Sequence, residues 1–293
     1  MRFMIGADPE LMLEHEGKLK SAIGIVPGTK HVPHRLEKGA AQHDNVMCEF
    51  NVDPASTPGE FVENIRTVLI QLDKIVRPAR MKVQASADFP DSELADPEAR
   101  AFGCDPDFDA WRLEVIKVSP KAAGASLRSA GGHLHLGTVK GKPKFLLDDY
   151  GKVDVVKTLD IIIGIPSVFL DKDPTANKRR SLYGRAGCHR PKEYGVEYRT
   201  LGNWWIKGPK TVSLVYRLAE EALSLVESGK YKDLINELGE DNIQDIINKS
   251  LVDVAREQFF KIAAPFISKS VANDIKRLET NNLVGDLYSE WRI

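Results

Sequence analysis

Polar and apolar residues alternate in several short stretches of this chain, which is the period expected of β-strands with one polar and one apolar face. In residues 3–13, FMIGADPELML, the acids Asp8 and Glu10 point to one side, while an alanine and two leucines point to the other. Pro9 stands between the acids and cannot donate to a β-ladder, which suggests an edge strand or a bulge.

Three later stretches show the same pattern and also place site-type residues on their polar face. They lie within residues 44–53, 127–137 and 195–201, with Glu49 and Asn51, His133 and His135, and Glu197 and Arg199 as the respective polar pairs. Four such strands are explained most simply by one antiparallel sheet with an apolar face against helices and a polar face open to a ligand. Residues 82–89 resemble a further strand returning toward this sheet.

Apolar residues at helical spacing predict the helices that cover the sheet. Thr57 and Pro58 begin one helix, whose apolar positions recur until Pro78. Residues 153–163 are apolar nearly all round, typical of a buried helix, and Gly164-Ile165-Pro166 interrupts it. Another helix spans residues 209–226, and the remainder from Gly229 reads as helical.

The predicted fold class is therefore α+β, with a curved, mainly antiparallel sheet, helices on one of its faces and a helical C-terminal extension. We expect a catalytic domain at residues 1–228 and the extension at residues 229–293, which we assign to packing or to contacts with a partner. No internal repeat is evident.

Composition narrows the class of partner. The chain has 293 residues, 42% of them apolar, with 41 Lys and Arg against 42 Asp and Glu. Such a balance gives no general attraction to nucleic acid or to a membrane surface. The start lacks a signal-peptide core, and Cys48, Cys104 and Cys188 form no C-x-x-C pair. A cytoplasmic location is the expectation, in the host cell if a phage encodes the protein.

Two polar segments are read as loops. One carries His31, His34 and His43, whose spacing matches no metal motif, so solvated histidines are expected. The other, residues 88–109, holds eight acids and a single basic residue. It is either a solvated loop or a lid that attracts a cationic amine.

The polar faces of the predicted strands suggest metal and phosphate chemistry. Carboxylates at positions i and i+2 converge on one face and repel each other unless a cation or a proton lies between them. Oxygen-rich sites of this kind suit Mg²⁺ or Mn²⁺. Arginines gathered in residues 179–203 could bind phosphoryl oxygens. Each motif alone also has an ordinary reading, as a turn, a surface ion pair or structural histidines.

The blocks GADPEL, DNVMCEFNVDPAS, GGHLHLG and YGRAGCHRPKEYGVEYRTLGNWW resemble a known family. They are similar to the phage carboxylate–amine ligases (COOH-NH2 ligase, type 2), within the glutamine synthetase and glutamate–cysteine ligase superfamily. The resemblance covers Gly6 to Trp205 and leaves the helical tail outside.

This resemblance implies roles for matching residues. Glu10 and Glu49 would hold one metal ion, and Asp8, His133 and Glu197 another. Asp8 stands where the superfamily usually has glutamate, and its shorter reach implies binding through water. His135, Arg179 and Arg190 would contact the nucleotide phosphates, and Arg199 the phosphoryl group or the substrate carboxylate. The implied catalytic residues are Glu197, Arg199 and Arg185.

The activity implied by the resemblance is an ATP- and Mg²⁺-dependent (or Mn²⁺-dependent) carbon–nitrogen ligase, which forms an amide bond through an acyl phosphate. Its substrates would be a small-molecule or peptide carboxylate and amine; nucleic acid is not expected except as a modified base, which is also open as a substrate. An oligomer is open too, and no membrane partner is expected. The alternatives are a phosphotransferase on the same scaffold and a non-catalytic nucleotide-binding module.

Overall fold

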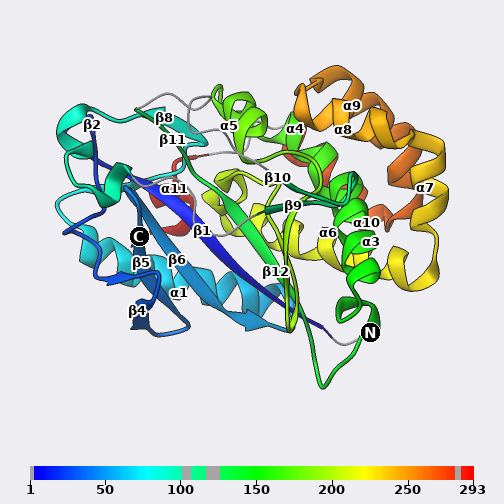
Figure 1. The fold of residues 1–293 in the computed structure, drawn as a ribbon, viewed down its shortest axis with the longest axis horizontal. Helices are drawn as coiled ribbons and strands as arrows, with labels where there is room; N and C mark the ends of the chain where they lie inside the picture. Colours follow the sequence, from blue (N-terminus) through cyan, green and yellow to red (C-terminus); the bar gives the residue numbers. More distant parts are fainter. Residues whose placement is uncertain (1–2, 101–106, 117–125, 281–284) are drawn as a thin grey trace.

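The sheet that the alternating stretches predict is the centre of the structure. The computed structural model describes residues 3–100, 107–116, 126–280 and 285–293. Ten strands follow one another in the order β10-β9-β13-β14-β12-β1-β6-β5-β4-β3, and β2 and β7 pair with β1 at its far end. Every pairing is antiparallel. Figure 1 shows β1, β6 and β12 side by side across the middle of the molecule.

The strands of this sheet are β1 Phe3–His15, β2 Lys18–Lys20, β3 Gly28–Thr29, β4 Val32–Leu36, β5 Gly39–Asp44, β6 Met47–Ala55, β7 Arg80–Lys82, β9 Asp107–Asp109, β10 Glu114–Ile116, β12 Gly132–Thr138, β13 Cys188–Lys192 and β14 Gly195–Tyr198. A separate pair is formed by β8 Ser86–Asp88 and β11 Leu127–Ser129.

The helices are α1 Pro58–Val76, α3 Asp149–Leu159, α4 Ile165–Leu170, α5 Ala176–Leu182, α6 Pro209–Ser228, α7 Tyr231–Leu238, α8 Glu240–Asn248, α9 Val252–Gln258, α10 Lys269–Thr280 and α11 Leu287–Trp291. Short 3-10 turns are η1 Asp91–Leu94, η2 Glu98–Arg100, η3 Lys144–Leu146, η5 Asn203–Lys207 and η7 Ala264–Phe266; π-turns are η4 Asp160–Gly164 and η6 Phe259–Ala263.

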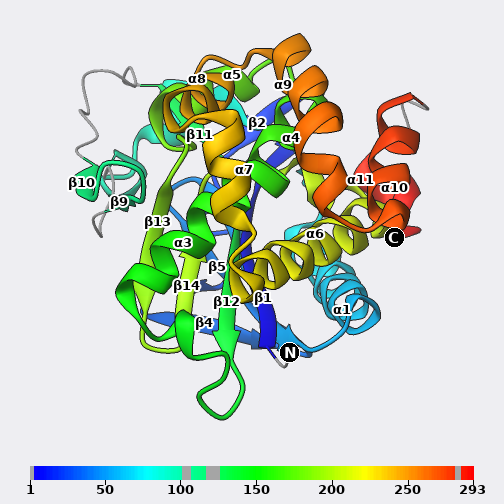
Figure 2. The same ribbon diagram turned by 90° about the vertical axis from the view of Figure 1, so that its right-hand side faces the viewer.

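The two faces of the sheet differ as the alternation predicts. On β6, Cys48, Phe50 and Val52 are buried in the main hydrophobic core, whereas Glu49 and Asn51 line a cavity on the opposite face. Helices α1, α3 and α6 pack behind the apolar face, as the two views show (Figures 1 and 2). The α+β class with a large antiparallel sheet is thereby confirmed.

Helix α1 begins where its sequence signals predict. The hydroxyl of Thr57 accepts a hydrogen bond from the Glu60 amide at 3.1 Å, and proline occupies the first turn. Phe61 is fully buried and stacks on Trp205 with ring centroids 5.9 Å apart. The helix ends at Val76, just before the Arg77-Pro78 bond.

Three strand predictions are wrong in detail. Strand β1 is central rather than at an edge. The Glu10 amide donates to the Gly131 carbonyl on the β12 side, so Pro9, one residue earlier, directs its nitrogen towards β6, where the register contains no pair at Pro9. A register shift with β6 does occur, between Ile5 and Ala7. Residues 82–89 and 127–137 each split, because β8 and β11 leave the main sheet and pair with each other.

The polar segments predicted as loops contain regular structure. The three histidines fall in a region where β3, β4 and β5 extend the sheet, with His34 opposite Ala41. Backbone pairing holds His34 in β4 and His43 in β5 despite their weak apolar pattern, whereas His31 lies between β3 and β4. The acidic segment contains η1, η2 and β9, and its residues 101–106 lie outside the described residues.

Gly164 and Pro166 do not break the buried helix. Instead, α3 runs through the π-turn η4 into α4, and the amide of Ile165 donates to the carbonyl of Asp160. A π-turn shifts the hydrogen-bond register by one residue, which lets a proline follow without ending the helix. Asp160, the first residue of this π-turn, is completely buried.

The C-terminal helices share the core of the sheet. Buried residues of α7 to α11 belong to the same hydrophobic cluster as the strands. Phe259 packs on Phe169 of α4 with ring centroids 6.2 Å apart, and the indole of Trp291 donates to the Ile206 carbonyl at 2.8 Å. The tail therefore packs on the rest of the chain, and a domain boundary at residue 228 stays a prediction.

Two further expectations can be compared with the structure. Within the described parts of the chain, no helix combines the length and the apolar character needed to cross a membrane. Cys48 and Cys188 are buried and carry free thiols, and Cys104 lies outside the described residues.

Candidate functional site

The polar faces of the four predicted strands meet in one cavity of about 990 Å³. The sequence-predicted site residues that line it are Asp8, Glu10, Glu49, His133, His135, Arg179, Arg190, Glu197 and Arg199. Strands β6, β1, β12 and β14 are neighbours in this order, so residues that are far apart in the sequence lie side by side. The predicted meeting of these polar side chains on one face of the sheet is therefore confirmed.

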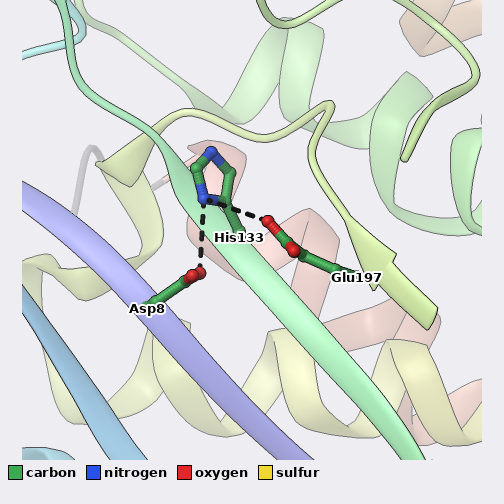
Figure 3. Close-up of side chains that lie close together, drawn as sticks. All are labelled: Asp8, His133 and Glu197. Carbon is green, nitrogen blue, oxygen red and sulfur yellow. Dashed lines mark ion pairs between the residues drawn. The ribbon is translucent and has the colours of Figure 1, made fainter. Parts of the chain in front are cut away.

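The first acidic cluster consists of Asp8, His133 and Glu197 (Figure 3). His133 Nδ1 lies 3.3 Å from Asp8 Oδ1 and 4.0 Å from Glu197 Oε1. The three residues come from β1, β12 and β14. Asp8 is paired with His133 and Glu197 with His135, so the three side chains share one face of the sheet. His133 and Glu197 are buried.

Electrostatics in this cluster favour ionised carboxylates. Burial raises the pKa of Asp8, but the imidazoles of His135 and His133 outweigh it and hold that pKa well below its ordinary value. Burial and Asp8 also raise the pKa of Glu197, yet Arg199 and the two histidines leave it lowered. The site therefore keeps charged oxygen ligands over the physiological pH range.

This donor set fits a divalent cation. Asp8 Oδ1 is buried and close to two imidazole nitrogens, but no donor aligns with it in a hydrogen bond. A buried oxygen without an aligned donor is costly unless another group satisfies it. Two carboxylates and one imidazole nitrogen within 4.8 Å of one another would satisfy the preferences of Mg²⁺ or Mn²⁺.

The second acidic cluster consists of Glu10, Asp44 and Glu49. Burial, followed by the charges of Asp8, Glu10 and Asp44, raises the pKa of Glu49 well above its ordinary value. Burial and Glu10 raise the pKa of Asp44. These shifts express burial first and the mutual repulsion of the carboxylates second, and a divalent cation would relieve both.

Backbone and side-chain amides fix the oxygens of the second cluster. The Gly131 amide donates to Glu10 Oε2 at 2.5 Å, and Gln42 Nε2 donates to Glu49 Oε2 at 3.0 Å. Gly132 must be glycine, because a Cβ there would lie 2.4 Å from the Gly202 carbonyl oxygen and 2.5 Å from the Trp205 indole nitrogen. The backbone at Gly202 therefore lies directly against β12 at this position.

Two arginines lie beside the first cluster. Arg199 forms an ion pair with Glu197 and donates to His133 Nδ1 at 3.2 Å. Asp107 Oδ1 lies 2.9 Å from Arg190 Nε and 3.0 Å from Arg199 Nε, as ion pairs rather than as aligned hydrogen bonds. Asp107 therefore holds both guanidinium groups at the wall of the cavity.

His135 is held between a carboxylate and a phenol. Its Nε2 lies 3.1 Å from Asp8 Oδ1, and its Nδ1 lies 2.5 Å from the hydroxyl of Tyr194. Burial lowers the pKa of His135, but Asp8 outweighs it and leaves that pKa raised. Tyr194 belongs to the turn between β13 and β14 and lines the cavity.

The remaining predicted arginines differ from each other. Arg179 lines the cavity and is buried, and its guanidinium donates to the carbonyls of Leu201 and Arg199 at 2.9 and 3.1 Å. These hydrogen bonds fix the backbone of the segment that follows β14. Arg185, expected to be catalytic, is exposed, donates to the Ser181 carbonyl and is not among the described residues that line the cavity.

A buried carboxylate supports this wall of the site from behind. Asp160 Oδ2 accepts hydrogen bonds from the Trp111 indole at 2.7 Å and the Gly187 amide at 2.6 Å. Its Oδ1 accepts from the hydroxyls of Tyr198 at 2.7 Å and Thr200 at 3.1 Å. One side chain thus connects the segments that carry Asp107, Arg190, Glu197 and Arg199.

Sequence reasoning missed several residues that line this cavity. Asp44 lies at the end of β5, which was read as part of a loop, and its register with β6 places it near Glu49. Lys192 was also missed. It lies two residues after Arg190 on β13 and therefore on the same face of the strand, so the pattern R-P-K was the available signal. Asp107 carried no signal that distinguished it from the other acids of its segment.

The fold and site together define a class: an α+β protein whose antiparallel sheet carries two carboxylate clusters and a group of arginines in a single cavity. The chain belongs to the family described as phage phiEco32-like COOH.NH2 ligase-type 2, whose model matches residues 119–291, more than half of the sequence. None of the curated proteins matches the chain.

The matched segment differs from the expected one. It includes His133, His135, Glu197 and the arginines, and it continues through the C-terminal helices. The expectation that the helical tail lies outside the family's pattern is therefore wrong. Asp8, Glu10 and Glu49 precede the matched segment, and it is the sheet that brings them to the site.

Proposed function

We propose that this protein is an ATP- and Mg²⁺-dependent ligase that joins a carboxylate to an amine through an acyl phosphate. The observation that carries the proposal is the meeting of two carboxylate clusters and paired arginines in one large cavity. The family name, which specifies a COOH.NH2 ligase, supports an acid and an amine as the two substrates.

The residues fit the demands of this chemistry. Asp8, His133 and Glu197 would hold one divalent ion, and the second cluster of carboxylates another. Such ions neutralise phosphate oxygens, which the carboxylates of the site would otherwise repel. The guanidinium groups of Arg190 and Arg199, fixed by Asp107, are positioned to bind phosphoryl oxygens.

A carboxylate needs activation because its oxygen is a poor leaving group. Transfer of the terminal phosphoryl group of ATP to the acid gives an acyl phosphate and ADP. The amine then attacks the carbonyl carbon, loses a proton and releases inorganic phosphate. Enclosure of the substrates in a cavity of about 990 Å³ would limit the access of water to the acyl phosphate.

A direct test incubates the protein with ATP, Mg²⁺ and pools of amino acids and small peptides. ADP and phosphate should appear only when an acid and an amine are both present, and Glu197→Gln should remove this turnover. A stable phosphorylated product without free phosphate would instead favour a phosphotransferase. Persistent lack of turnover in a folded protein that binds ATP would contradict catalysis of either kind.

A further inference from the structure

Glu197 is surrounded by cations to an unusual degree. Its Oε1 forms the ion pair with Arg199 and lies 3.8 Å from Arg190 Nη1, and its Oε2 lies 2.8 Å from Lys192 Nζ. The Glu197 side chain is 2% exposed and the Lys192 side chain 32% exposed. A nearly inaccessible carboxylate is thus contacted by a lysine that reaches solvent.

The charges around Glu197 are not shared equally. Arg190 and Arg199 both pair with a second carboxylate, Asp107, whereas the one ion pair of Lys192 within the described residues is with Glu197. With Asp8, which shares the metal cluster with Glu197, the group contains three permanent cations and three carboxylates. A divalent ion bound by Asp8 and Glu197 would leave this group with a net positive charge, which is unfavourable at low exposure unless an anion enters as well.

Lys192 is the cation best placed to move away from Glu197 when a divalent ion binds there. It lies on β13, two residues beyond Arg190, and both side chains line the cavity. Its partial exposure and flexible stem allow the ammonium to leave Glu197 at small cost, whereas Arg190 and Arg199 are fixed by Asp107. Lysine binds phosphate as a compact point charge with three donors.

We propose that Lys192 is a substrate-binding residue that contacts Glu197 until a divalent ion takes that carboxylate, and then binds the phosphate groups of the nucleotide. Lys192 would thereby couple metal binding to polyphosphate binding at this site. The inference rests on the proposed function only in assuming that the anion is a polyphosphate.

The variant Lys192→Met separates the two roles because it should move two affinities in opposite directions. Without the competing ammonium, the cluster containing Glu197 should bind Mn²⁺ alone about tenfold more tightly. With inorganic tripolyphosphate as the anion, binding of its Mn²⁺ complex should weaken about tenfold. Without metal, Lys192 contacts Glu197, so its removal should not change the affinity for free tripolyphosphate. The coupling between Mn²⁺ and tripolyphosphate therefore falls about a hundredfold.

Both affinities can be measured by calorimetric titration and by the electron paramagnetic resonance signal of free Mn²⁺. Lys178→Met, which removes an exposed lysine of α5, is the matched control and should leave both affinities unchanged. Lys192→Arg should restore most of the tripolyphosphate affinity. Circular dichroism establishes that each variant is folded.

Two outcomes would overturn the inference. If Lys192→Met weakens both affinities, the lysine only supports the local structure; if it changes neither, the lysine is a surface residue. These measurements need no turnover, so a failure to find ligase activity would leave the role of Lys192 standing or falling on its own data.

Discussion

Asp160 allows a quantitative test of how the wall of the site is held. Burial raises the pKa of this carboxyl to about 7 from an ordinary value of 3.8, against the four hydrogen bonds that lower it. Between these two values the folded protein keeps a proton that the unfolded chain has lost. The contribution of Asp160 to the free energy of unfolding therefore decreases as pH rises from about 4 to about 7 and is constant above that.

The magnitude follows from the size of the shift. A difference of about three pKa units corresponds to about 4 kcal/mol, or about 1.4 kcal/mol for each pH unit within the window. The variant Asp160→Asn does not titrate. Its amide oxygen can accept from the Trp111 indole and the Gly187 amide while its NH2 group donates to the two hydroxyls, so we expect it to fold.

The assay is urea unfolding of wild type and Asp160→Asn at intervals from pH 5 to pH 8. The free energy of unfolding of the variant should increase relative to that of the wild type by about 1.4 kcal/mol per unit up to about pH 7. Asp241→Asn, at an exposed position of α8, is the control and should follow the wild-type curve. A wild-type-to-variant difference that is independent of pH would refute the reasoning, because it would mean that the four donors keep Asp160 ionised throughout.

Three other substitutions test separate parts of the structure. Thr57→Ala removes the N-cap of α1 and should lower the free energy of unfolding by about 1 kcal/mol in urea titrations, and no change would mean that the cap is replaced by solvent. In protein stripped of metal with a chelator, the raised pKa of Glu49 means that the free energy of unfolding decreases as pH rises above about 4.5, and Glu49→Gln should flatten this decrease in urea titrations. The same variant should remove one class of Mn²⁺ sites, and an unchanged number of sites would contradict a metal site at the second cluster. Asp107→Asn should lower kcat/KM for ATP by about tenfold to a hundredfold, because it frees Arg190 and Arg199 from their shared carboxylate, and unaltered steady-state kinetics would show that Asp107 does not position them.

The elements whose polar and apolar residues repeat with a regular period could be predicted from the sequence. Alternation assigned the cavity-facing and core-facing residues of β1, β6, β12 and β14, because a strand with one buried face carries a strong pattern. Strands β4 and β5 were missed because neither carries an alternation of large apolar residues: β4 exposes Val32 to Arg35, and β5 begins with the small residues Gly39, Ala40 and Ala41. The π-turn at η4 has no pattern of its own, so Gly164 and Pro166 were read as a break.

The candidate site could be predicted in part for the same reason. Residues at positions i and i+2 of a strand share a face whatever the rest of the chain does, which gave Asp8 with Glu10 and His133 with His135. Asp44 and Asp107 depend on the order of strands in the sheet, which local sequence does not contain. Arg185 was assigned from the family resemblance and not from a strand pattern; it is exposed and is not among the described residues that line the cavity.

The most direct measurement of the central proposal follows an oxygen isotope. Acids labelled with ¹⁸O in the carboxyl group are incubated with the protein, ATP, Mg²⁺ and an amine pool, and the released phosphate is analysed by mass spectrometry. An acyl phosphate requires that one labelled oxygen pass from the carboxylate to the phosphate for each amide formed. Phosphate without label would mean that ATP is only hydrolysed, and would contradict ligation through an activated acid.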